Sequence, residues 1–182
     1  DHQNILKKHH WVKDIKKEID LPIQLQNDVK MIHQGCYFTY QQDSTYYLYI
    51  NEVGIGSSYF YKDEPLYGRS GIMGEIGLIS LKGKTINQQI RECQNQEEFN
   101  EILSLLLSMV FTMIDPKRLE LSLDLKWRYE ENIIEKVLNE INQSCFENLY
   151  FHEDVSSMLF DGLVYRGVVY LLKERIEKNE KI

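Results

Sequence analysis

The sequence predicts an α/β fold in which helices flank a mixed or parallel sheet, and three patterns point to it. Residues 44–51 and 55–61 are rich in Tyr and Ile and have the character of strands. Residues 97–114 are expected to form a buried helix, because their apolar part is shorter than the ~20 residues that span a bilayer. The second half alternates strands with helices, which implies crossover connections. Its expected elements are strands at 119–125 and 148–152 and helices at 132–141 and 161–178.

The first half contributes further elements. Lysines oppose an apolar stripe in residues 11–19, as in an amphipathic helix. A short strand follows, and Asn27 or Asp28 is expected to cap a helix that ends near Cys36. The remaining expected elements are the strand at 23–25, a possible strand at 78–81 and a helix at 86–93.

Composition bounds the class of protein. The chain has 182 residues, of which 43% are hydrophobic and 27% charged, as expected for one soluble globular domain. Cys36, Cys93 and Cys145 are scattered, which argues against a disulfide framework and for a reducing cytoplasm. A net charge of −7 argues against DNA binding by these residues unaided. Because the chain starts with Asp1 rather than Met, we expect a fragment of a longer protein.

Three motifs carry the chemistry. Asn27-Asp28 follows the expected strand, Gly54-Ile55-Gly56 joins two strands, and a loop with four glycines at a three-residue interval ends in Gly74-Glu75-Ile76-Gly77. Each motif also has a plainer interpretation, because Asn-Asp pairs commonly cap helices and glycine-rich loops are commonly turns. In this order and spacing, the three together resemble the sugar-site half of the ROK family (repressor, open reading frame, kinase).

The resemblance implies a ribonuclease H-like, actin-like ATPase fold, of which the chain would be the C-terminal lobe with the sugar-proximal segment. It assigns sugar contacts to Asn27, Asp28, Gly71 and Glu75, and Asp28 would stand at the position of the general base. The histidine that relatives place after the glycine loop is Leu78 here, which removes one polar contact. Gly167 would mark a position where the last helix packs closely.

The motifs with which members of the family bind phosphate and metal are degenerate or missing in this sequence. Gly54 and Gly56 are the remnant of a Gly-Thr-Gly-Ile-Gly phosphate loop in which Glu52 and Val53 have replaced the first Gly and the Thr. A carboxylate repels phosphate, and Val provides no hydroxyl donor. The family's cysteine cluster and its Gly-Gly turn against adenosine are also missing, so we expect no zinc and no other cofactor.

We therefore interpret residues 1–182 as a single sugar-sensing or oligomerisation domain of a cytoplasmic ROK-type transcriptional regulator that does not catalyse phosphotransfer. A sugar or sugar phosphate and a second copy of the chain are the expected partners. DNA would be bound only by a helix-turn-helix before Asp1, and no membrane is involved. A truncated ATP-dependent sugar kinase and a purely structural dimerisation module remain alternatives. A helix-turn-helix upstream of Asp1 would identify the regulator, and an Asp-x-Gly-x-Thr strand would identify the kinase.

Overall fold

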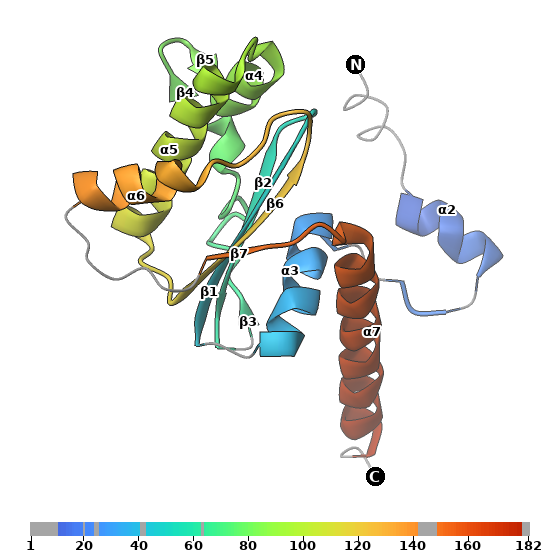
Figure 1. Cartoon of the computed structure of the whole chain (residues 1–182). Helices are drawn as coiled ribbons and strands as arrows, with labels where there is room; N and C mark the ends of the chain where they lie inside the picture. Colours follow the sequence, from blue (N-terminus) through green and yellow to red (C-terminus); the bar gives the residue numbers. More distant parts are fainter. Residues whose placement is uncertain are drawn as a thin grey trace.

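A five-stranded mixed sheet forms the centre of the computed structural model, which describes residues 11–19, 21–23, 26–40, 43–62, 64–141 and 149–179 (Figure 1). The strand order is β3-β2-β1-β6-β7; β1 and β2 are antiparallel, whereas β6 lies parallel to both β1 and β7. A separate small hairpin pairs β4 with β5. The strands are β1 Ser44–Asn51, β2 Ile55–Tyr61, β3 Glu64–Pro65, β4 Ser80–Leu81, β5 Lys84–Thr85, β6 Arg118–Asp124 and β7 Leu149–Phe151.

Helices cover both faces of the sheet, and side-chain caps mark where several of them begin, α4 and α5 among them. Thr85 and Gln88 form a reciprocal capping box at the start of α4, and Asn95 accepts from the Glu98 N–H at the start of α5. The helices are α2 Trp11–Glu18, α3 Asp28–Tyr40, η1 Ile76–Leu78, α4 Ile86–Glu92, α5 Gln96–Met113, α6 Glu131–Glu140 and α7 Val155–Asn179.

The two faces of the sheet differ in character. Because side chains alternate along a strand, Tyr46, Leu48 and Ile50 of β1 lie on one face and join the main apolar core with α5 and α6. Tyr47 lies on the other face with a smaller cluster from α3. Buried polar side chains are concentrated on the strands and helix of this second side, among them His33, Thr45, Ser58, Glu120 and Ser122.

Helices α3 and α7 lie side by side across the second face (Figure 1) and approach most closely through two glycines. A Cβ on Gly162 would lie 1.8 Å from the Met31 carbonyl oxygen, and one on Gly35 would lie 2.1 Å from the Met158 carbonyl oxygen. Gly167, for which the resemblance implied close packing, has no heavy atom within 4 Å of such a Cβ. The close-packing role therefore belongs to Gly162 and not to Gly167.

The far side of α7 is apolar and exposed. The stretch Val155–Lys173 has the length and composition of a membrane-spanning helix, and 6% of it is buried. No described residue covers its outward side chains, of which Phe160, Leu163, Leu171 and Ile176 are each at least half exposed.

Most expected elements are present, with five differences. Helix α3 continues to Tyr40 rather than ending near Cys36. Ile23 lies outside any strand, and residues 24–25 of that expected strand are outside the described residues. The segment at 78–81 is split between η1 and β4. Helix α7 begins at Val155, six residues earlier than expected, because Asp154 accepts from the Ser157 N–H in its first turn. Helix α5 is buried on one side only, since Met113 is 75% exposed.

Candidate functional site

Asn27 and Asp28 lie at the N-terminus of α3, next to the end of the sheet. The Asn27 Oδ1 atom accepts from the Lys30 N–H at 3.0 Å, so Asn27 is a helix cap, as its plainer interpretation proposed. Asp28 Oδ1 accepts from the Val29 N–H at 2.8 Å. Both side chains are exposed, and the Asp28 charge helps to raise the pKa of Tyr49, for which burial is the main cause. The Asp28 carboxylate thus faces solvent, where a ligand can reach it.

Glu75 lies within electrostatic reach of the same helix. Its charge partly offsets the lowering of the Lys30 pKa, which burial causes. The Lys30 ammonium in turn lies 4.1 Å from the centroid of the Tyr67 ring, a cation–π geometry. Lys30 and Tyr67 were not among the residues that the sequence indicated. A lysine in the first turn of a helix is ordinarily solvated, so only the fold reveals that Lys30 is 5% exposed.

The glycine loop before Glu75 is built around backbone geometry. Gly71 has a φ of +75° and open space where a Cβ would be, so glycine serves the turn itself. At Gly74 a Cβ would lie 2.3 Å from the Ser57 carbonyl oxygen, and the Ser57 hydroxyl donates to the Gly74 carbonyl at 2.7 Å. Leu78, at the position of the family's histidine, is 58% exposed.

The turn between β1 and β2 contains the phosphate-loop remnant, and its N–H groups already have partners. Asn51 Oδ1 accepts from the N–H groups of Val53 and Gly54 at 2.9 and 3.0 Å. Asn87 Oδ1 accepts from the Ile55 N–H at 2.7 Å. Phosphate loops bind anions through converging backbone N–H groups. Here, two asparagine oxygens occupy these donors.

Side chains also restrict the space around this turn. An added Cβ at Gly54 would lie 2.5 Å from Asn87 Oδ1, and one at Gly56 would lie 2.4 Å from a Val29 methyl group. Arg91 donates to the Val53 carbonyl at 2.7 Å and so ties α4 to the turn. Neither Asn51 nor Asn87 was indicated by the sequence, since a single asparagine carries no local signal. The glycines at 54 and 56 are therefore explained by packing.

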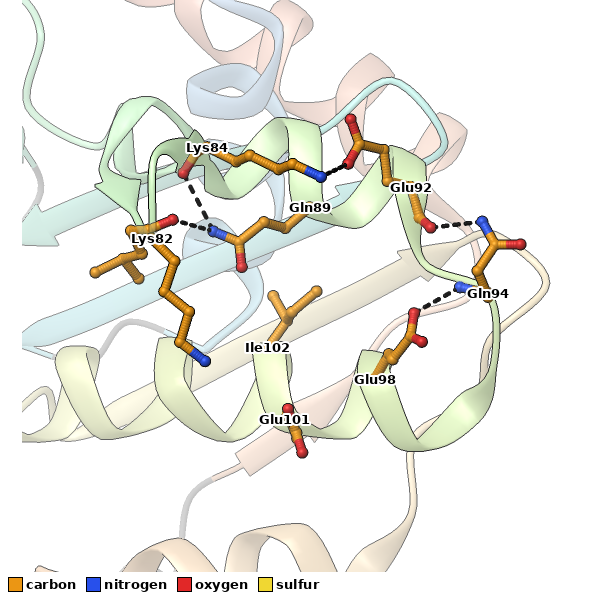
Figure 2. Close-up of a pocket in the computed structure, with 9 residues that line it drawn as sticks. Lys82, Lys84, Gln89, Glu92, Gln94, Glu98, Glu101 and Ile102 are labelled. Atoms are coloured by element: carbon orange, nitrogen blue, oxygen red, sulfur yellow. Dashed lines mark hydrogen bonds and ion pairs between the residues drawn. The ribbon is translucent and has the colours of Figure 1, made fainter.

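One surface groove lies apart from these residues, although Asn51, Glu52 and Val53 line a second hollow and Gly74 lines a third. The first groove has a volume of ≈ 450 Å³. Its lining side chains, drawn in Figure 2, come from the β4–β5 hairpin, α4, α5 and the segment between the two helices. Several of its polar groups pair with one another: Lys84 with Glu92 at 2.5 Å, and the Gln94 N–H with Glu98 at 2.8 Å. The groove does not include Asn27, Asp28 or Glu75.

The mixed sheet and its helices have the actin-like ATPase architecture. The ROK family model matches residues 2–105, which is more than half of the chain. The chain belongs to the ROK family.

Solved structures agree on the fold. A ROK family protein from Streptococcus pneumoniae in complex with sucrose is 17% identical, with a TM-score of 0.62 over 91% of this chain and 71% of that chain. The ROK hexokinase of Thermus thermophilus is 14% identical, with a TM-score of 0.55 over 84% of this chain and 69% of that one.

The ROK glucokinase of Streptomyces griseus, in complex with glucose and AMPPNP, is 13% identical, with a TM-score of 0.58 over 82% and 70% of the two chains. At these identities the similarity establishes the fold. The comparison with curated proteins found no match.

Proposed function

We propose that the chain is a sugar-sensing domain that binds a sugar or sugar phosphate through Asn27, Asp28 and Glu75 and does not transfer phosphate. The observation that carries the proposal is the occupied phosphate turn, where Asn51 and Asn87 accept from the donors that a nucleotide would need. The exposed carboxylates of Asp28 and Glu75 are suited to accept hydrogen bonds from sugar hydroxyls.

The biological role that fits this chemistry is the effector domain of a ROK-type transcriptional regulator in the cytoplasm. A domain outside the chain would bind DNA, because the net charge of −7 disfavours direct contact with phosphates. A homo-oligomer is part of the proposal, since the exposed apolar side of α7 offers surface for association.

A truncated sugar kinase is the second candidate, and the complex of the Streptomyces griseus glucokinase with glucose and AMPPNP favours it. The two candidates differ in nucleotide binding: a kinase binds both the sugar and ATP, and a sensor binds sugar alone. A dimerisation module would bind neither.

Calorimetry with a panel of sugars and sugar phosphates tests the proposal, using the longest soluble form of the protein. We expect weak, millimolar binding of glucose-like sugars, because Leu78 replaces one polar contact and such a loss costs about 1–3 kcal/mol. Asp28→Asn and Glu75→Gln should each weaken the binding further. A matched control is Glu101→Gln, an exposed carboxylate in the groove of Figure 2, which should leave affinity unchanged.

The outcomes separate the candidates. Binding that is indifferent to both Asp28→Asn and Glu75→Gln would place the sugar site elsewhere. Binding of ATP comparable to that of a kinase would favour the truncated enzyme. No binding of any sugar or nucleotide would favour the dimerisation module.

A further inference from the structure

Three potential metal ligands from separate parts of the chain meet on the polar side of the sheet. Cys36 lies on α3, Glu120 on β6, and His152 directly after β7. One ligand atom from each, the Cys36 sulfur, a Glu120 oxygen and a His152 nitrogen, lies within 4.8 Å of the other two. Ligands that are 84 and 32 residues apart leave no spacing motif, which is why local sequence predicted no zinc site.

The two oxygens of the Glu120 carboxylate have different partners, and this positions the three potential ligands. Oε1 accepts from the Arg118 guanidinium, and Oε2 contacts the Nε2 atom of His152. The His152 backbone is fixed as well, since its N–H donates to the Leu121 carbonyl at 3.0 Å. The Cys36 sulfur lies 2.9 Å from the Met158 sulfur of α7. The three ligand atoms are therefore positioned before any ion arrives.

We propose that Cys36, Glu120 and His152 form a binding site for Zn²⁺. A thiolate, an imidazole and a carboxylate are the three side chains that zinc prefers. Bond lengths of about 2.0–2.3 Å in a tetrahedral site place ligand atoms roughly 3.3–3.8 Å apart, so the present arrangement needs only small side-chain rotations. A water molecule would take the fourth position.

Charge balance supports the assignment. On binding, the Cys36 thiol loses its proton to solvent, so the thiolate and the Glu120 carboxylate together neutralise the two charges of the ion. Arg118 keeps its hydrogen bond to Glu120 Oε1 and orients the carboxylate from behind, as outer partners of metal ligands commonly do. No oxidation or reduction takes place.

An ion can reach the site from solvent. Cys36 and Glu120 are buried, but the His152 side chain is 17% exposed and β7 is at the edge of the sheet. The Met158 sulfur beside Cys36 shields the thiol from the other side. Binding would join α3, β6 and the segment that leads into α7. A bound ion would therefore stabilise the fold by linking these elements.

Zinc titration with a competing chelator, with Co²⁺ as the spectroscopic substitute, tests the proposal on the full chain. We expect one equivalent of Zn²⁺, a thiolate-to-cobalt charge-transfer band and a raised melting temperature on zinc addition. Substituting a residue that only hydrogen-bonds to a metal ligand costs about 10–100-fold in metal affinity. Loss of the ligand itself in Cys36→Ser should therefore weaken zinc binding by more than about a hundredfold and abolish the charge-transfer band.

Cys93→Ser is the matched control, because Cys93 is also a buried thiol and donates to the Asn95 carbonyl, away from Glu120 and His152. It should retain both zinc and the cobalt band. If Cys36→Ser fails to fold, Cys36→Ala and His152→Gln provide the same comparison. Less than one equivalent of zinc in the unmodified protein, or equal loss in the Cys36 and Cys93 variants, would overturn the proposal. In that case Arg118, Glu120 and His152 form a buried ion-pair network only.

Discussion

Asn87 Oδ1 accepts a hydrogen bond from the Ile55 N–H at 2.7 Å and so ties the first turn of α4 to the start of β2. The same amide side chain would lie within 2.5 Å of a Cβ at Gly54 and within 2.1 Å of one at Gly77. One asparagine thus joins the phosphate-turn remnant, the end of the glycine loop and α4.

We predict that Asn87→Ala lowers the free energy of unfolding by about 1–3 kcal/mol, because it leaves the buried Ile55 N–H without its acceptor. Urea denaturation measures the change. Asn139→Ala, at an exposed position of α6, is the control and should change stability by less than about 0.5 kcal/mol. Equal effects of the two changes would show that the Asn87 bond does not stabilise the turn.

Two glycines of α7 should respond to alanine in opposite directions. Gly162→Ala places a methyl group 1.8 Å from the Met31 carbonyl oxygen, which forces α3 and α7 apart. We expect a loss of roughly 2–4 kcal/mol, in the range of severe core changes. Gly167→Ala meets no atom within 4 Å and should stabilise the helix by up to about 1 kcal/mol. Thermal unfolding of both variants checks the difference, and a Gly162→Ala protein of unchanged stability contradicts the observed packing.

The free energy of unfolding should decrease as the pH is lowered, because His33 is buried in its neutral form. Burial lowers the pKa of this histidine to about 3, and the charge of His152 acts in the same direction, against the backbone of Ser58, which accepts from the ring and raises the pKa. Its Nε2 lies 2.8 Å from the Thr45 hydroxyl, and its ring stacks on Tyr47.

The direction of this pH dependence follows from the difference in bound protons between the folded and unfolded chains. Below the ordinary histidine pKa of about 6.5 the unfolded chain binds a proton at His33 that the folded chain excludes, so folding stability is complete above that pH and decreases below it. The decrease approaches about 1.4 kcal/mol per pH unit. Urea unfolding from pH 7.5 to 4.5, compared with His33→Gln, isolates this contribution from the carboxylates. Identical slopes for the two proteins would exclude it.

We expect no appreciable phosphotransfer from ATP to a hexose, even in the longest natural form of the protein. Asn51 and Asn87 occupy the N–H donors of the turn, and the Glu52 carboxylate is exposed beside it. A coupled assay with glucose measures turnover. Active kinases reach ~1 per second or more, and a rate of that size would refute the prediction.

The sequence was sufficient for what depends on local pattern. Alternating apolar residues predicted β1, β2 and β6 within about one residue, and caps such as Asn27 predicted the start of α3. It failed where a long-range contact decides the outcome. The role of Gly162 depends on the Met31 carbonyl across the α3–α7 interface, which no spacing in the sequence reveals.

The same limit applies to the site. The motif positions Asn27, Asp28, Gly71 and Glu75 came from family resemblance, and their role in sugar binding stays a prediction. Lys30 and Asn87 could not be found in advance, since a lone lysine or asparagine has no local signature. Lys30 becomes buried beside the Tyr67 ring, and Asn87 accepts from the Ile55 N–H, only after the sheet and helices have assembled.

The contact between Gly162 and α3 also limits how this chain can diverge. The Met31 carbonyl belongs to the backbone, so no substitution at position 31 can make room for a side chain at 162. Gly35 faces the Met158 carbonyl under the same restriction. Divergence at either glycine therefore requires the two helices to shift as bodies, which would also move the Asn27-Asp28 end of α3. We expect homologues either to retain small residues at both positions or to lose both the close α3–α7 contact and the proposed sugar site.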